Sequence, residues 1–234
     1  MRVCTVVVRW EPGRPLWLAA VRDERTARPF DDPDAWWPDR PDVIGGRDRV
    51  AGGSWCVSDV SAGTSALVLN RPQRPVAEPG AASRGVLPLL ALEHGARWPA
   101  HVERAGMASF ALLLATPAAL TLWTYDGTSL SEDELRSGTH MVTSGGGEDG
   151  KAERYLAGFT AGRSTDDWRA LFLGHRPQDD PAALVVRHET SEWVYATVFA
   201  QVFSSAPGTL RLTYSRTPWL DGTWTSTTRT ASPR

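Results

Sequence analysis

The sequence predicts an α+β fold with a mostly antiparallel sheet at its N-terminal end. Short apolar runs separated by turn residues fill about the first 70 positions. Segments of helix-like composition follow, and strand-like segments return near the end of the chain. A chain of 234 residues can bury a sizeable core, so we expect one domain over 1–222 and a polar C-terminal tail over 223–234. The order of elements alone leaves several α+β arrangements open.

A hairpin opens the chain. Val3 to Trp10 and Leu16 to Val21 are apolar runs, and the residues between them are typical of a turn. Two glycine pairs, Gly45-Gly46 and Gly52-Gly53, bracket a tight turn and permit the close approach of a ligand or a neighbouring strand. Further strands are predicted over 54–59 and 66–69, and irregular loops over 31–42 and 71–82.

The rest of the chain reads as helices followed by strands. Helices are predicted over 86–94, 99–105, 151–160 and 165–173. Strands are predicted over 110–115, 119–125, 139–143, 184–188, 193–204 and 209–214. Between them, residues 131–134 resemble a solvated acidic segment.

Composition excludes several classes of function. A net charge of -2 gives no footprint for a polyanion, so nucleic acid is not an expected partner. No apolar run approaches membrane-spanning length and no signal peptide is recognisable, so we expect a cytoplasmic protein without a membrane span. Two cysteines, Cys4 and Cys56, are too few for a disulfide framework or a structural zinc site, and no metal is expected. Lys151 is the only lysine, which together with the alanine, glycine and proline content suggests a GC-rich bacterial genome.

Four consecutive charged residues, 22–25, follow the apolar part of the second strand, and the thiol of Cys4 lies on the strand before it. Charges at the end of a buried strand need a partner or a charged ligand once water is removed. One interpretation is a solvated loop with internal arginine–carboxylate pairs. The other is a site built around the Cys4 thiol.

A set of spaced motifs favours the second interpretation. They are Cys4-Thr5, Arg22-Asp23-Glu24 before Arg28-Pro29, Gly45-Gly46-Arg47-Asp48, Gly52-Gly53-Ser54-Trp55, Leu69-Asn70, Ser83-Arg84-Gly85 and Gly138-Thr139-His140. In this order they resemble the NRDE family, the family of animal transport and Golgi organisation protein 2, within the N-terminal nucleophile hydrolase-like superfamily. The resemblance implies a four-layer αββα sandwich.

The resemblance also implies a chemistry. In such hydrolases the side chain of the first mature residue attacks an amide carbonyl, and its own α-amino group serves as the base. Cys4 matches the nucleophile, Arg22 and Asp23 match an arginine and an aspartate on the next strand, and Asn70 matches a donor to the oxyanion. Trp55, His140 and Ser144 are the candidate substrate-binding residues.

The sequence departs from the family pattern at four points. Cys4 follows three residues, of which the initiator Met1 is not expected to be removed before a bulky arginine, and Val21 replaces the first letter of the signature. Ser144 stands where a second asparagine is expected, and Val198 where an arginine is expected. His140 is the histidine best placed to replace a missing amine as base, or to bind haem iron.

Three functions follow from these observations. The first is thiol-dependent hydrolysis or transfer of an acyl group on a small amide or thioester through Cys4, without a cofactor. The alternative is a non-catalytic protein that uses the same pocket to bind and carry haem or an acyl lipid. The third is a structural module in which the charged residues form only an ion-pair network.

Overall fold

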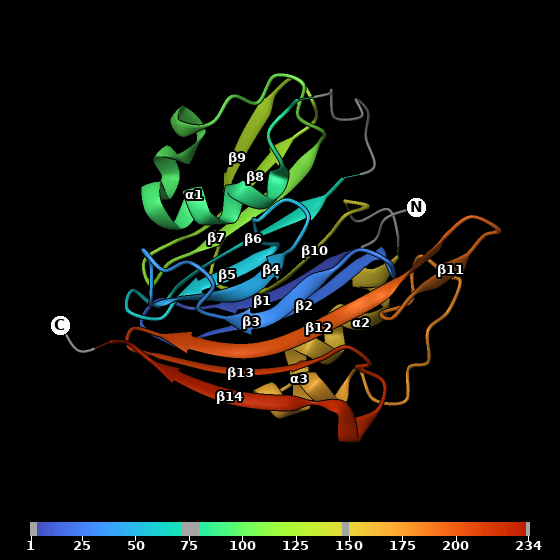
Figure 1. The fold of residues 1–234 in the computed structure, drawn as a ribbon. Coiled ribbons are helices and arrows are strands. Elements are labelled where there is room, and N and C mark those ends of the chain that lie inside the picture. Colours follow the sequence, from blue (N-terminus) through green and yellow to red (C-terminus); the bar gives the residue numbers. More distant parts are fainter. Residues whose placement is uncertain (1–3, 72–79, 147–149, 233–234) are drawn as a thin grey trace.

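The computed structural model describes residues 4–71, 80–146 and 150–232. The predicted loop over 71–82 lies mostly outside these residues. Two antiparallel sheets contain most of the regular secondary structure, and a few short helices lie on their outer faces (Figure 1).

The first sheet contains both the opening hairpin and the last strands of the chain. Its strands, in spatial order, are β10 (Gly138–Thr143), β1 (Thr5–Trp10), β2 (Leu16–Arg25), β12 (Val194–Ala206), β13 (Thr209–Ser215) and β14 (Thr225–Thr230). The short strand β11 (Arg187–Glu189) pairs with the beginning of β12. Strands from the two ends of the chain are therefore neighbours, because β2 pairs with β12 over most of its length.

The second sheet is a meander in which each strand pairs with the next along the chain. It contains β3 (Phe30–Asp34), β4 (Val43–Asp48), β5 (Cys56–Asp59), β6 (Thr64–Asn70), β7 (Phe110–Ala115), β8 (Leu120–Tyr125) and β9 (Leu130–Glu134). The helices are α1 (Leu87–His94), α2 (Lys151–Ala161) and α3 (Thr165–Ala170), with 3₁₀ turns η1 (Arg84–Val86), η2 (Gly95–His101) and η3 (Asp221–Thr223). None of the helices in the described ranges is long and apolar enough to cross a membrane.

Alternation along the strands divides the apolar residues between the faces of the sheets. On β1, Val6 and Val8 belong to the cluster between the two sheets, whereas Val7 belongs to the cluster that includes Phe159 and Trp168 of the helices. A further cluster joins the second sheet to α1 and η2 around Trp98. Successive side chains on a strand point to opposite faces, so β1 and β2 contribute to both sides of the first sheet.

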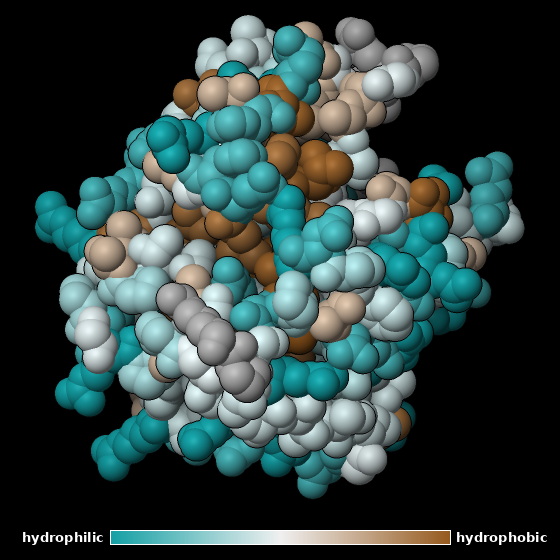
Figure 2. All heavy atoms as spheres, turned by 60° about the vertical axis from the view of Figure 1, so that its left-hand side comes forward, coloured by the Kyte–Doolittle hydropathy of each residue, from teal (hydrophilic) through white to brown (hydrophobic). Residues whose placement is uncertain are grey.

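On the face seen in Figure 2, hydrophilic and neutral residues predominate, and apolar atoms show mainly in recesses between polar ridges. Among the described residues, the large apolar side chains that are clearly exposed are Val50, at 64%, and Leu220, at 51%. Burial of the remaining large apolar side chains supplies the main driving force for this fold.

The structure confirms the opening hairpin and the helices predicted near 86–94, 151–160 and 165–173. The helix predicted over 99–105 is wrong, because its first residues belong to η2 and the chain leaves helical geometry at Val102. Gly45 and Gly46 lie inside β4, and not at the edge of a turn as predicted.

Three segments predicted to be loop, solvated segment or tail contain strands. Residues 31–42 include part of β3, residues 131–134 lie in β9, and the expected polar tail, 223–234, contains β14. Four of the six residues of β14 are threonines, whose branched side chains suit extended backbone, and the strand pairs with β13 from Thr209 to Tyr214.

Candidate functional site

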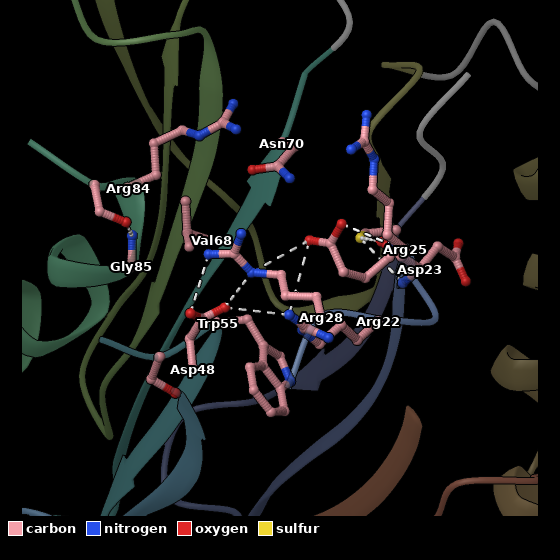
Figure 3. A pocket seen from close by; sticks show the side chains of 14 residues that line it. Arg22, Asp23, Arg25, Arg28, Asp48, Trp55, Val68, Asn70, Arg84 and Gly85 are labelled. Carbon is pink, nitrogen blue, oxygen red and sulfur yellow. Dashed lines mark hydrogen bonds and ion pairs between the residues drawn. The ribbon is translucent and has the colours of Figure 1, made fainter. Parts of the chain in front are cut away.

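A pocket of about 370 Å³ opens where the end of β2 faces the second sheet. Figure 3 shows its side chains converging from both sheets and from the turn that precedes α1. Fourteen residues line it: Cys4, Arg22, Asp23, Glu24, Arg25, Arg28, Asp48, Ser54, Trp55, Val68, Asn70, Ser83, Arg84 and Gly85. Six of the seven motifs on which the family resemblance rests contribute residues to this lining, although they are far apart in sequence, and Gly138-Thr139-His140 does not.

The charged run 22–25 is part of strand β2 and not a loop. It stays extended because it pairs with the beginning of β12, where Asp23 lies opposite Thr197 and Arg22 lies opposite Phe199. The register shifts between these two partners, as at a β-bulge, and such irregularities re-aim side chains near functional sites. Val198, the position where the family pattern has an arginine, lies at this irregularity.

The Cys4 thiol is held by the backbone of Asp23. The Asp23 N–H donates to the Cys4 Sγ at 3.4 Å, and the thiol lies 3.5 Å from the carbonyl oxygen of the same residue. Burial, and after it the nearby Asp23 carboxylate, raise the pKa of the Cys4 thiol to about 12, against the opposing effects of the Asp23 N–H and Arg22. At neutral pH the thiol is therefore protonated and needs a base before it can attack.

Arg22 lies beside the thiol and is only 6% exposed. Its Nη2 is 3.3 Å from the Oδ2 of Asp48 and 3.8 Å from the Oε2 of Glu24. The guanidinium stacks 4.7 Å from the ring centre of Trp55, which is close enough for a cation–π interaction. Burial lowers the pKa of Arg22, although the carboxylates oppose this effect. Its Nη1 is buried and has no hydrogen-bond partner among the described residues.

Asp48 anchors the arginines of the pocket. Arg28 donates from Nε and Nη2 to its two carboxylate oxygens, at 2.6 and 3.0 Å. The backbone N–H groups of Val50 and Ala51 donate to the same carboxylate. Burial by itself would raise the pKa of Asp48, but these hydrogen bonds hold it below its usual value. The wall formed by Arg22, Arg28 and Asp48 is consequently fixed in its charged form.

The side chain of Asp23 lies on the opposite face of the first sheet from the thiol. Its Oδ1 accepts a hydrogen bond from the Thr197 hydroxyl at 2.5 Å, and its Oδ2 is 4.0 Å from the Nζ of Lys151. The carboxylate is fully buried, and burial raises its pKa to about 6, whereas Lys151, Thr197 and Arg22 lower it. The carbonyl oxygen of Asp23 accepts a hydrogen bond from the Tyr195 hydroxyl. One residue thus contacts the pocket through its backbone and the helical side through its carboxylate.

Asn70 belongs to a strand of the second sheet, and Trp55 directly precedes another strand of that sheet, β5. Asn70 is the last residue of β6, and its amide lies between the guanidinium groups of Arg25 and Arg84 in Figure 3. Trp55 packs over Gly46, where even a methyl group would approach the indole ring to 2.2 Å. The absence of a side chain at Gly46 therefore fixes the ring that stacks on Arg22.

Of the two further candidate residues, Ser144 lies next to Cys4, whereas His140 lies farther along the strand β10 and outside the pocket lining. The N–H of Ser144 donates to the Cys4 carbonyl at 3.0 Å, which extends the β1–β10 pairing by one residue and places Ser144 opposite Cys4. Its hydroxyl is buried and has no hydrogen-bond partner among the described residues. His140 lies opposite Val8 and its Nε2 is 2.7 Å from the carbonyl oxygen of Arg136. His140 is not among the described residues that line the pocket.

Sequence reasoning gave no role in the site to two residues of this region. Lys151 and Thr197 both contact the Asp23 carboxylate, one as an ion pair and the other through a hydrogen bond. The signal available for Lys151 was its status as the only lysine in the chain. Within the described ranges, no group of three or more histidine, cysteine, aspartate or glutamate side chains is arranged to hold a metal ion.

The fold and the pocket define a mixed α/β protein of two antiparallel sheets, with a thiol beside a network of arginines and carboxylates. The sequence model of the Transport and Golgi organisation 2 family matches residues 1–161, and the chain belongs to this family. The match covers all fourteen residues of the pocket and ends with helix α2. No curated protein matches the chain.

Proposed function

We propose that this pocket carries out thiol-dependent hydrolysis or transfer of an acyl group on a small amide or thioester, in a four-layer αββα fold of the N-terminal nucleophile hydrolase type. The observation that carries the proposal is the meeting of Cys4, Arg22 and Asn70 in one pocket. These residues supply a nucleophile, a cation and an amide donor, which acyl transfer requires together.

The reaction begins when the Cys4 Sγ attacks the carbonyl carbon of the substrate. The carbonyl electron pair moves to the oxygen, and the Asn70 amide N–H groups stabilise the resulting oxyanion. Collapse of this intermediate expels the amine or thiol with a proton and leaves an acyl group on the sulfur. Water then attacks the thioester and releases the acid, or a second nucleophile takes the acyl group in transfer.

A base must first take the thiol proton, since the pKa of Cys4 is raised to about 12. No histidine is among the described residues that line the pocket. The α-amino group of a chain that begins at Cys4 is the base that suits this geometry. With an ordinary pKa near 8, it accepts the thiol proton and returns it to the leaving group.

The charge of the pocket favours a polar substrate with an anionic group. Half of the fourteen lining residues are charged. Glu24 and Asp48 are paired with Arg22 and Arg28, and the guanidinium groups of Arg25 and Arg84 lie on either side of Asn70 in Figure 3. The Nη1 of Arg84 also donates to the Ser109 carbonyl at 2.8 Å. Guanidinium groups at this position favour a carboxylate or phosphate next to the scissile bond.

The alternative is a non-catalytic carrier of haem or an acyl lipid that uses the same pocket. The high pKa of Cys4 favours it, because a protonated thiol without a base is not a nucleophile. The lining argues against it, since sites for such ligands are mainly apolar. Titration of the full chain with haem, followed by absorbance, tests the alternative, and an unchanged haem spectrum contradicts it.

The proposed activity is tested with two forms of the protein, the full chain and a chain released from a fusion so that it begins at Cys4. Both forms are incubated with p-nitrophenyl acetate, with an acetyl thioester and with N-acetyl amino acids. The intact mass of the protein is then measured. We expect the form that begins at Cys4 to gain the mass of one acetyl group and to turn over.

The matched controls are the two cysteines. Cys4→Ser should lose acylation, whereas Cys56→Ser should keep it, because Cys56 is buried between the sheets and is not among the residues that line the pocket. Acylation that persists in Cys4→Ser, or a folded chain beginning at Cys4 that is never acylated, contradicts the proposal.

A further inference from the structure

We propose that Lys151 is a positioning residue for Cys4, acting from the far side of the first sheet by keeping the Asp23 carboxylate ionised and by tying helix α2 to the start of β1. This inference rests on the proposed function, because it concerns the same nucleophile. Lys151 does not line the pocket and contacts no reacting atom.

The position of Lys151 is unusual for a lysine. It is the first residue of α2 and is 0% exposed. Its Nζ donates to the Thr5 Oγ1 at 3.0 Å and lies 4.0 Å from the Asp23 Oδ2. Thr5 directly follows the nucleophile, so a single ammonium group joins α2, β1 and β2 below Cys4.

Burial of an ammonium group costs several kcal/mol unless charges and hydrogen bonds compensate for it. An apolar residue of similar length would fill this space without that cost, as buried ion pairs are often replaced without loss of stability. The chain nevertheless has its only lysine here. A role in setting the charge state of Asp23 accounts for this choice.

One carboxylate oxygen of the ionised Asp23 can accept a further hydrogen bond. Oδ1 accepts the Thr197 hydrogen bond, whereas Oδ2 is buried and accepts no hydrogen bond from the described residues. The β1–β2 register pairs Thr5 with Val21, so the backbone nitrogen of Cys4 lies toward the level of Asp23. In a chain that begins at Cys4, an ionised Asp23 would hold the α-amino group, whereas a protonated one would not.

The groups that face Asp23 come from four parts of the chain. They are Cys4 before β1, Arg22 on β2, Lys151 on α2 and the Thr197 and Tyr195 hydroxyls on β12. Farther away, Asp180 also interacts with Lys151 and is itself paired with Arg154. Lys151 is the cation whose charge opposes the protonation of Asp23 most strongly.

The test compares Lys151→Met, which keeps length and removes charge, with Lys151→Arg, which keeps charge. The titration of Asp23 is followed in each folded full chain by carboxyl carbon NMR, with the signal assigned by its absence in Asp23→Asn. We expect the midpoint to rise by about one pH unit or more in Lys151→Met and to stay near its original value in Lys151→Arg.

A second readout separates positioning from support of the fold. In chains that begin at Cys4, acylation by p-nitrophenyl acetate at pH 7 should fall in Lys151→Met and recover in Lys151→Arg. The fall follows the ionised fraction of Asp23, and is about twofold if the Asp23 midpoint rises by one unit from about 6 and about tenfold if it rises by two. An Asp23 midpoint that does not move in a folded Lys151→Met chain overturns the inference, even if stability falls. Should Lys151→Met fail to fold, Lys151→Gln provides the same comparison with a polar side chain. The failure of the proposed function is distinct, because then no chain is acylated at Cys4 whatever the Asp23 midpoint.

Discussion

Asp23 acts on both faces of strand β2. Its backbone N–H donates to the Cys4 thiol on the pocket side, and its carboxylate lies with Lys151 and Thr197 on the helical side. The sequence predicts that Asp23 belongs to the site, because the residue lies in a recognisable motif. The sequence could not predict that the backbone and the carboxylate of Asp23 act on opposite faces. Which face each side chain takes is known only because residues 22–25 continue strand β2, along which side chains alternate between the two faces.

The first prediction at this scale concerns pH and stability. The pKa of Asp23 in the folded protein is about 6, above its ordinary value of 3.8. Between these two values the folded chain keeps a proton that the unfolded chain has released, so the free energy of unfolding falls as pH rises through this window. A shift of about two units corresponds to about 3 kcal/mol.

We therefore expect wild type to lose up to about 3 kcal/mol relative to Asp23→Asn between pH 4 and pH 7. Urea unfolding of both proteins at a series of pH values measures this difference. A difference in the free energy of unfolding that is constant with pH would show that Asp23 titrates normally in the folded protein.

At the scale of elements, the strands that the sequence missed share a position in the fold. Strands β3, β9 and β14 are all edge strands, with hydrogen-bonded neighbours on one side. Edge strands carry charges, proline and other polar residues because one side faces water, and this removes the apolar alternation by which strands are recognised. The sequence predicts central strands such as β1 and β7, which are buried over nearly all of their length.

The turn between β4 and β5 shows the opposite case, in which a local sequence signal was informative. The glycine pair 52–53 predicted a close approach of backbones, and the structure confirms it at Gly53. A methyl group there would lie 2.3 Å from the carbonyl oxygen of Gly85. That carbonyl accepts the N–H of Ser54 at 2.9 Å, which holds the turn before α1 against the pocket.

We predict that Gly53→Ala pushes this turn away from the pocket and lowers the free energy of unfolding by about 1–3 kcal/mol, as overpacking does elsewhere. Gly222→Ala is the matched control, because no atom lies within 4 Å of the added methyl group. It should change stability by less than about 1 kcal/mol. Urea unfolding measures both, and equal stability of the two variants would mean that the contact with Gly85 relaxes freely.

For the whole molecule, the site depends on how the two sheets are stacked. Cys4 and Arg22 lie in or next to strands of the first sheet, whereas Trp55 and Asn70 lie in or next to strands of the second. The sheets are joined by an apolar cluster that includes Phe203, Leu113 and Cys56. No local pattern predicts this stacking, because it pairs segments far apart in sequence. The family resemblance is what suggested it.

The last prediction asks whether the two sheets unfold as one unit. Phe203 is 2% exposed in the cluster between them, so Phe203→Ala should lower the free energy of unfolding by about 3–5 kcal/mol. Val50→Ala, at a residue that is 64% exposed, should change it by about 0.5 kcal/mol or less. Urea unfolding gives these values.

The reactivity of Cys56 provides an independent measurement of whether the two sheets separate only on global unfolding. It is 3% exposed, so a thiol reagent reaches it only when the sheets separate. If separation requires global unfolding, its alkylation in native buffer should be at least about 100-fold faster in Phe203→Ala, since each 1.4 kcal/mol corresponds to a factor of ten. An unchanged rate in a destabilised Phe203→Ala chain would show that Cys56 is reached by a local opening. In that case the second sheet can move away from Cys4 while the rest of the fold persists, and the pocket would not be a fixed feature of the folded chain.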